Sequence, residues 1–105
     1  MGTVEDGLMP RILKQAQVEL DFLEIWLYTF NQWGENQADD DLDDLGTAIE
    51  LLANQPQMCR QRHEFKPPVR IHDHAHHLIV YTALDDGVPL IRILHEEMDV
   101  ASQLD

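Results

Sequence analysis

The hydrophobic pattern changes period at Pro56, and this change restricts the fold more than any other feature of the sequence. Before Pro56, apolar residues recur every three or four positions, which is the spacing of amphipathic helices. After it, short runs rich in β-branched residues are separated by turn residues, which is typical of strands. The chain has 105 residues, enough for one compact domain. We therefore expect an α+β fold, with an N-terminal helical hairpin packed on a small antiparallel β-sheet.

The first predicted helix, Ala16 to Trp33, is apolar on two faces. One stripe at helical spacing consists of Val18, Phe22, Ile25, Trp26, Thr29 and Trp33. The other stripe consists of Leu20, Leu23, Leu27 and Phe30. Because so small a domain cannot bury both stripes, we expect a partner chain to cover the second one. Without that partner, the protein should self-associate.

The second predicted helix follows Gly34, which fits the end of the first. Asn36 can serve as its N-cap, and acidic residues from Asp39 to Asp44 suit the positive end of a helix dipole. Pro56 ends the helix. The buried side of this helix is expected to carry Ala38, Leu42, Leu45, Ile49 and Leu52.

Three strands are predicted beyond Pro56, at Val69 to His72, His77 to Leu84 and Val88 to Leu94. Asp85-Asp86-Gly87 is a turn signal, because Asp-Gly readily supplies positive φ between two apolar runs. A further edge strand near Arg11 to Leu13 has a weaker signal. The expected core or near-core residues include Ile25, Trp26, Leu45, Leu52, Ile79, Tyr81, Ile91 and Ile93.

The charge balance is strongly acidic, with 20 acidic and 7 basic residues and a formal net charge of -13. Such a charge argues against direct binding to nucleic acid. The basic residues Arg60, Arg62, Lys66 and Arg70 are grouped before and within the first strand of the sheet. Cys59 is the single cysteine, and no window is apolar enough to span a membrane. We expect a cytoplasmic protein without disulfides.

Several segments resemble the ParE toxins of the RelE/ParE superfamily. The segments Leu23 to Thr29, Gln32-Trp33-Gly34 and Gln37-Ala38 resemble the first helix and its turn, and Leu51 to Pro56 resembles the end of the second helix. The most specific match combines His77-Leu78-Ile79-Val80-Tyr81, Asp85-Asp86-Gly87, Ile91-Arg92-Ile93-Leu94-His95 and Met98-Asp99-Val100. The resemblance covers Ile12 to Leu104, so residues 1–10 are expected to be an N-terminal extension and residues 11–105 a single toxin domain.

This resemblance implies the toxin of a type II toxin–antitoxin pair, which a ParD-like antitoxin neutralises. It also implies action on DNA gyrase without cofactors and without enzymatic activity in the usual sense. We expect the antitoxin to cover Leu20, Leu23, Leu27 and Phe30. Contact with gyrase protein, rather than with DNA, is expected from Arg60, Arg62, Arg70, Arg92, His95, Met98 and Asp99.

Two alternatives share the same resemblance. In the RelE-like branch, ribosome-dependent endoribonucleases cut messenger RNA, and Arg70, Arg92 and His95 would then hold the phosphate and transfer protons. That set is incomplete, because the chain has only two lysines, Lys14 and Lys66. The other alternative is a detoxified member that retains antitoxin binding. Arg92 is alternatively expected to form an ion pair with one of the many acids.

A histidine cluster at His72, His74, His76 and His77 suggests a metal site, because imidazoles on alternate strand residues share a face. Neither a cysteine nor a suitable carboxylate completes the ligand spacing, since Asp73 points to the other face of a regular strand. We therefore expect a polar hairpin turn and no bound metal.

Overall fold

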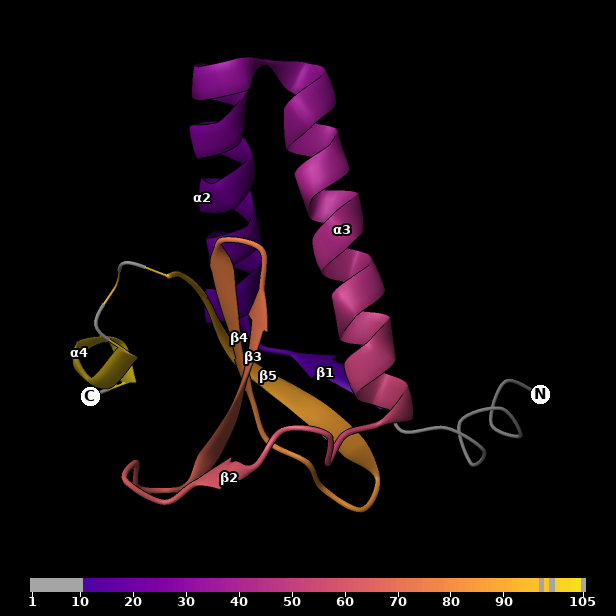
Figure 1. Cartoon of the computed structure of the whole chain (residues 1–105), viewed down its shortest axis with the longest axis vertical. Coiled ribbons are helices and arrows are strands. Elements are labelled where there is room, and N and C mark those ends of the chain that lie inside the picture. Colours follow the sequence, from indigo (N-terminus) through magenta and orange to yellow (C-terminus); the bar gives the residue numbers. More distant parts are fainter. Residues whose placement is uncertain (1–10, 97, 99, 105) are drawn as a thin grey trace.

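The computed structural model of the chain describes residues 11–96, 98 and 100–104 (Figure 1). The proposed N-terminal extension, residues 1–10, and the proposed contact residue Asp99 lie outside the described residues. The elements in chain order are β1 (Arg11–Lys14), α2 (Ala16–Trp33), α3 (Glu35–Asn54), β2 (Gln61–Arg62), β3 (Val69–His74), β4 (His77–Tyr81), β5 (Gly87–His95) and α4 (Val100–Leu104). The predicted order of a helical hairpin followed by a sheet is confirmed. No helix among these residues is long and apolar enough to cross a membrane.

The five strands form one sheet in the order β1-β5-β4-β3-β2. The pairs β2–β3, β3–β4 and β4–β5 are antiparallel, as expected, but β1 pairs with β5 in parallel. The antiparallel sheet is therefore confirmed for β2 to β5, and the weakly predicted edge strand is present as β1 but runs parallel to its neighbour. Because the helical hairpin and three strands separate β1 from β5, no local turn sets their relative direction. The short strand β2 was also missed, since the segment containing Arg62 was expected to be a loop.

The two long helices lie side by side as an antiparallel hairpin, and the single residue Gly34 joins them (Figure 1). Its N–H donates to the carbonyl of Phe30 at 2.9 Å, and its carbonyl accepts from the N–H of Ala38 at 3.1 Å. At φ 95°, Gly34 adopts a conformation that side chains disfavour. Gly34 therefore ends one helix and begins the next, and the prediction that Asn36 caps the second helix is wrong.

The main core lies between the hairpin and one face of the sheet. Among the predicted core residues, those buried here are Leu45, Leu52, Ile79, Tyr81 and Ile93. Ile25 is partly buried against this core, and Trp26 is also half-buried. Trp33, assigned to the buried stripe of the first helix, is instead 66% exposed. Its helical turn lies at the tip of the hairpin, beyond the strands that could cover it (Figure 1).

A smaller cluster covers the outer face of the sheet, the face away from the hairpin. Val69, Val80 and Leu94 are its buried centre, and the side chains that pack around them are Phe65, Ile71, Leu78, Ile91, Val100 and Leu104. Two of these come from α4, so the C-terminal helix is a lid on this face. Ile91 therefore belongs to the outer cluster rather than to the core under the hairpin.

The fourth strand ends at Tyr81, earlier than the expected end at Leu84. The N–H of Thr82 still donates to the carbonyl of Pro89 at 3.0 Å, but proline has no N–H to donate in return. Leu84 is exposed and forms only an isolated bridge with Gly87. Positive φ is confined, within the described residues, to Gly34 and Ala75. The expectation of positive φ at the Asp-Gly turn is therefore wrong.

Candidate partner-binding surfaces

An apolar stripe runs along the outer side of α2 and consists of Leu20, Leu23, Leu27 and Phe30, here called the α2 stripe. These side chains are 53%, 53%, 45% and 42% exposed. The buried residues of the same helix lie on the opposite side, where Val18 and Asp21 face the sheet and Thr29 faces α3. The domain thus leaves this second stripe uncovered, as the sequence predicted.

Aromatic side chains extend the α2 stripe toward α3. The ring of Trp26 stacks on Phe30, with centroids 5.0 Å apart and an interplanar angle of 24°. Its indole Nε1 donates a hydrogen bond to Oδ1 of Asp39 at 3.0 Å. This bond links the two helices beside the stripe. The apolar surface is therefore held on a braced helical pair.

A second surface is a groove of about 340 Å³ between α2 and the end of β5. It is here called the β5 groove, and the side chains that line it include Ile25, Tyr28, Arg92, His95 and Met98. A neighbouring hollow of about 290 Å³ shares Tyr28 and His95 with it. The two hollows meet at these residues, so the concave surface continues toward the tip of the hairpin.

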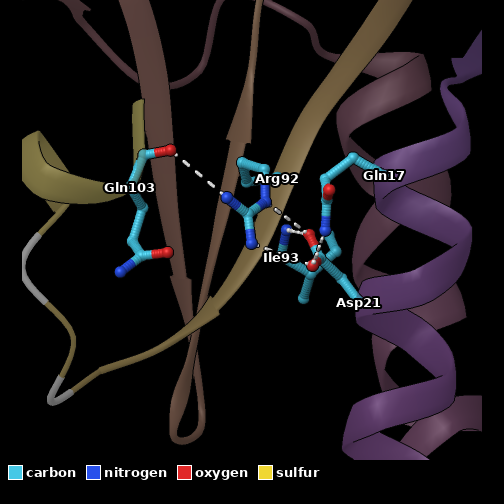
Figure 2. A network of polar contacts seen from close by, with 5 residues as sticks. All are labelled: Gln17, Asp21, Arg92, Ile93 and Gln103. Carbon is cyan, nitrogen blue, oxygen red and sulfur yellow. Dashed lines mark hydrogen bonds and ion pairs between the residues drawn. The ribbon is translucent and has the colours of Figure 1, made fainter. Parts of the chain in front are cut away.

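Asp21 and Arg92 both line the β5 groove, and Figure 2 shows the hydrogen bonds that join them. Arg92 donates from Nε to Oδ2 of Asp21 at 2.9 Å and from Nη2 to Oδ1 at 3.1 Å. Its Nη1 donates to the carbonyl of Gln103 on α4 at 3.2 Å. The hydrogen bonds with Asp21 raise the pKa of Arg92 above its ordinary value. The predicted ion pair of Arg92 is thus confirmed, and it joins α2, β5 and α4.

The carboxylate of Asp21 also accepts a hydrogen bond from the edge of β5 that β1 leaves unpaired. Pairing with β1 stops where Lys14 meets Leu90, so among the described residues no strand lies beside the rest of β5 on that edge. The N–H of Ile93 donates to Oδ2 of Asp21 at 2.9 Å, and Gln17 donates to Oδ1 at 3.2 Å. A helix side chain therefore takes the place of a strand carbonyl here.

The arginines proposed to contact a target do not gather in one place. Arg62 pairs with Glu64 at 2.8 Å, and Arg70 donates to the carbonyl of Cys59. In the β-ladder, Arg70 is opposite Tyr81 and Arg92 is opposite Val80, so the two side chains project from opposite faces. Only part of the proposed set, Arg92, His95 and Met98, lines the β5 groove, whereas Arg60, Arg62 and Arg70 lie near the β2 edge.

The proposed nuclease residues are likewise divided. Arg70 lies on β3 and makes its contact with a loop carbonyl, while Arg92 is engaged by Asp21. Only Arg92 and His95 line a common groove. A nuclease centre needs its phosphate-binding and proton-transferring groups around one reacting atom. The described side chains of this set do not provide that arrangement.

Histidines from three strands form a row that sequence analysis missed. His74 is opposite His77, and His77 is opposite His95, so the row depends on cross-strand register. The rings of His77 and His95 are 6.0 Å apart and nearly perpendicular. Burial, with a smaller contribution from His95, lowers the pKa of His77. Across the described part of the chain, no three His, Cys, Asp or Glu side chains are arranged to hold a metal ion.

A helical hairpin on a five-stranded sheet, with an apolar stripe open along its first helix, defines a small α+β protein with surfaces suited to a partner chain. Residues 12–100 match the family described as the ParE toxin of the type II toxin-antitoxin system, parDE. The chain therefore belongs to the ParE toxin family. Membership of this family makes an antitoxin its partner.

Two relatives and one solved structure agree with this assignment. A protein named Toxin ParE1 from Mycobacterium tuberculosis is 34% identical over 90 residues, covering 85% of this chain and 90% of the relative. Toxin ParE1 of Caulobacter vibrioides is 30% identical over 94 residues, covering 90% of this chain and 95% of the relative. A chain from the structure titled "Chromosomal ParDE TA system from P. aeruginosa" matches with a TM-score of 0.72 at 15% identity. The match covers 85% of this chain and 98% of that chain. That structure shares the fold.

Proposed function

We propose that this toxin inhibits DNA gyrase when free and that a ParD-like antitoxin neutralises it by covering the α2 stripe. The observation that carries the neutralisation is the line of four exposed apolar side chains on one helix face. Covering such a face removes apolar area from water, which favours association by roughly 25 cal/mol per Å² before the costs of binding. Without the antitoxin, the same stripe promotes self-association.

The β5 groove is the proposed contact for gyrase. It combines the apolar side chain of Met98 with two polar groups, Arg92 and His95. Arg92 is bound from the α2 side by its hydrogen bonds with Asp21. The net charge of -13 repels DNA within the Debye length, about 8 Å in physiological salt, so the contact is with the gyrase protein. Asp99 belongs to the same proposed segment, and Arg60, Arg62 and Arg70 form a separate secondary contact. Action on gyrase places the protein in the cytoplasm.

The test is expression in cells with and without the ParD-like antitoxin, beside cleavage of supercoiled plasmid by purified gyrase. We expect growth arrest with an SOS response, relieved by the antitoxin. The double variant His95→Ala with Met98→Ala should lose the arrest but still bind antitoxin. Leu84→Ala, which alters an exposed leucine on the β4–β5 turn, is the matched control and should remain toxic.

Two results would contradict the gyrase proposal. Arrested translation with cut messenger RNA and no DNA damage signal would identify a ribonuclease, with Arg70, Arg92 and His95 as the residues to substitute. Normal growth of cells that contain folded toxin and no antitoxin would identify a detoxified member. In that second case, antitoxin binding to the α2 stripe would still be measurable with purified proteins.

A further inference from the structure

We infer that the antitoxin segment covering the α2 stripe is a basic amphipathic helix. This inference rests on the proposed neutralisation and specifies the chemistry of the partner. Its starting point is the charge of the helical hairpin, which has no basic residue between Lys14 and Arg60. The same segment contains ten acidic residues, which are Glu19, Asp21, Glu24, Glu35, Asp39, Asp40, Asp41, Asp43, Asp44 and Glu50.

Most of this negative charge is open to solvent on the two helices of the hairpin. Glu19 and Glu24 are exposed on α2 itself, and Asp39 and Asp43 are exposed on the adjoining α3. None of these four carboxylates forms an ion pair with a described arginine, lysine or histidine. A partner that brings lysine or arginine to these positions would therefore gain attraction without breaking an existing ion pair.

The spacing of the stripe indicates a helical partner. Leu20, Leu23, Leu27 and Phe30 follow one another at intervals of three, four and three residues, which places them in line along about 15 Å of the helix. Three turns of a second helix present apolar anchors over the same length. Because the long stems of lysine and arginine can lie along apolar surface, basic residues beside those anchors would reach the flanking carboxylates.

A second copy of the toxin fits this surface less well. Pairing two stripes would bring two acidic hairpins together, and the repulsion would be strongest at low salt. A basic helix has the opposite dependence, because its attraction is strongest at low salt. The sign of the salt effect therefore separates the two occupants.

The test uses the full-length toxin and two synthetic helical peptides of about 15 residues. Both peptides have the same leucines on one face, and the flanking positions are lysine in one and glutamate in the other. Binding is measured by fluorescence anisotropy at about 50 mM and about 500 mM salt. We expect the lysine peptide to bind at least about tenfold more tightly at the lower salt concentration, and the glutamate peptide to bind at least about tenfold more weakly than the lysine peptide there.

Variants separate a defined site from general attraction to an acidic protein. Glu19→Gln with Glu24→Gln removes two charges beside the stripe and should raise the Kd of the lysine peptide about threefold to tenfold at low salt. Asp85→Asn with Asp86→Asn removes the same charge from the β4–β5 turn and should change the Kd by less than about twofold. Leu23→Ser with Leu27→Ser should abolish binding, whereas Leu51→Ser, at an exposed leucine on α3, should not.

Equal effects of the two charge variants, or equal binding of the two peptides, would overturn the inference. The natural ParD-like antitoxin provides a further measurement. If it binds the stripe and restores growth but its Kd does not rise with salt, the basic helix is wrong while the proposed neutralisation stands. Failure of the proposed function would appear differently, as an antitoxin that neither binds the stripe nor restores growth.

Discussion

The carboxylate of Asp21 on α2 accepts two hydrogen bonds from the guanidinium of Arg92 on β5, a residue 71 positions later in the sequence (Figure 2). Asp21 is only 3% exposed, and it also accepts the backbone N–H of Ile93. A buried charge is tolerated when it is paired and its remaining hydrogen bonds are satisfied. Because α2 carries the exposed stripe and borders the β5 groove, this ion pair sets the position of one surface relative to the other.

Removing Asp21 should be among the most destabilising single substitutions in the described part of the chain. Asp21→Ala leaves Arg92 without its counter-charge and the N–H of Ile93 without an acceptor, so we expect a loss of about 3–5 kcal/mol in the free energy of unfolding. Urea denaturation followed by circular dichroism measures it. Arg62→Ala breaks an exposed ion pair instead and should leave the midpoint almost unchanged. Similar midpoints for both variants would show that the Asp21–Arg92 pair contributes little.

The phenol of Tyr81 should stabilise the fold through its bond to the hairpin's exit loop. Its hydroxyl donates to the carbonyl of Pro56 at 3.0 Å, and Tyr81→Phe should cost about 1 kcal/mol of unfolding free energy. Burial raises the pKa of Tyr81 well above its ordinary value. The unfolded chain therefore loses this proton near pH 10 while the folded chain retains it, so stability falls above that pH. Tyr81→Phe should show a smaller alkaline fall, and an unchanged fall would refute this assignment.

Acid should destabilise the protein in part through His77. Because burial and His95 lower the pKa of His77, the unfolded chain binds a proton at higher pH than the folded chain does. Stability should therefore decrease as the pH falls below about 6.5. Denaturation at about pH 7.5 and about pH 5.5 measures the decrease, which should be smaller in His77→Gln. His63→Gln, at an exposed loop histidine, is the control, and an equal decrease in both variants would contradict the role of His77.

Substituting an exposed leucine of the α2 stripe should affect antitoxin binding, whereas substituting a buried leucine of α3 should affect stability. Leu23→Ser alters a side chain of the α2 stripe and should change the free energy of unfolding by no more than about 0.5 kcal/mol, while antitoxin binding is lost. Leu45→Ala empties a fully buried site on α3 and should cost about 2–5 kcal/mol. Urea denaturation and a binding assay on the same samples separate these effects. Retained antitoxin binding by a folded Leu23→Ser protein would argue against the stripe as the docking site.

Removal of the chain from Met98 onward should abolish toxicity while leaving the α2 stripe able to bind antitoxin. The truncation also removes Val100 and Leu104 from the outer cluster, and with them the carbonyl that accepts from Arg92. A lower unfolding temperature is therefore expected in addition. Met98→Ser retains α4 and should reduce toxicity without that change in temperature. Growth arrest by both proteins would place the target contact outside the β5 groove.

Much of the architecture was readable from local pattern. Ala16–Trp33 has helical spacing, and the strands after Pro56 have β-branched runs, so the type of each long element follows from neighbours within a few positions. The exposed stripe was predictable for a related reason. A helix with two apolar faces offers more apolar surface than one small sheet can cover, and this surplus is visible in the sequence.

The candidate sites depended on register and topology instead. The sequence predicted that Arg92 would pair with an acid, but 20 acidic residues were available, and only the crossing of α2 beside β5 selected Asp21. Cross-strand register likewise made a row of His74, His77 and His95 and placed Arg70 and Arg92 on opposite faces. Periodicity specifies which side of its own element a residue occupies. Which side chains meet across elements is decided by long-range pairing, which no local spacing encodes.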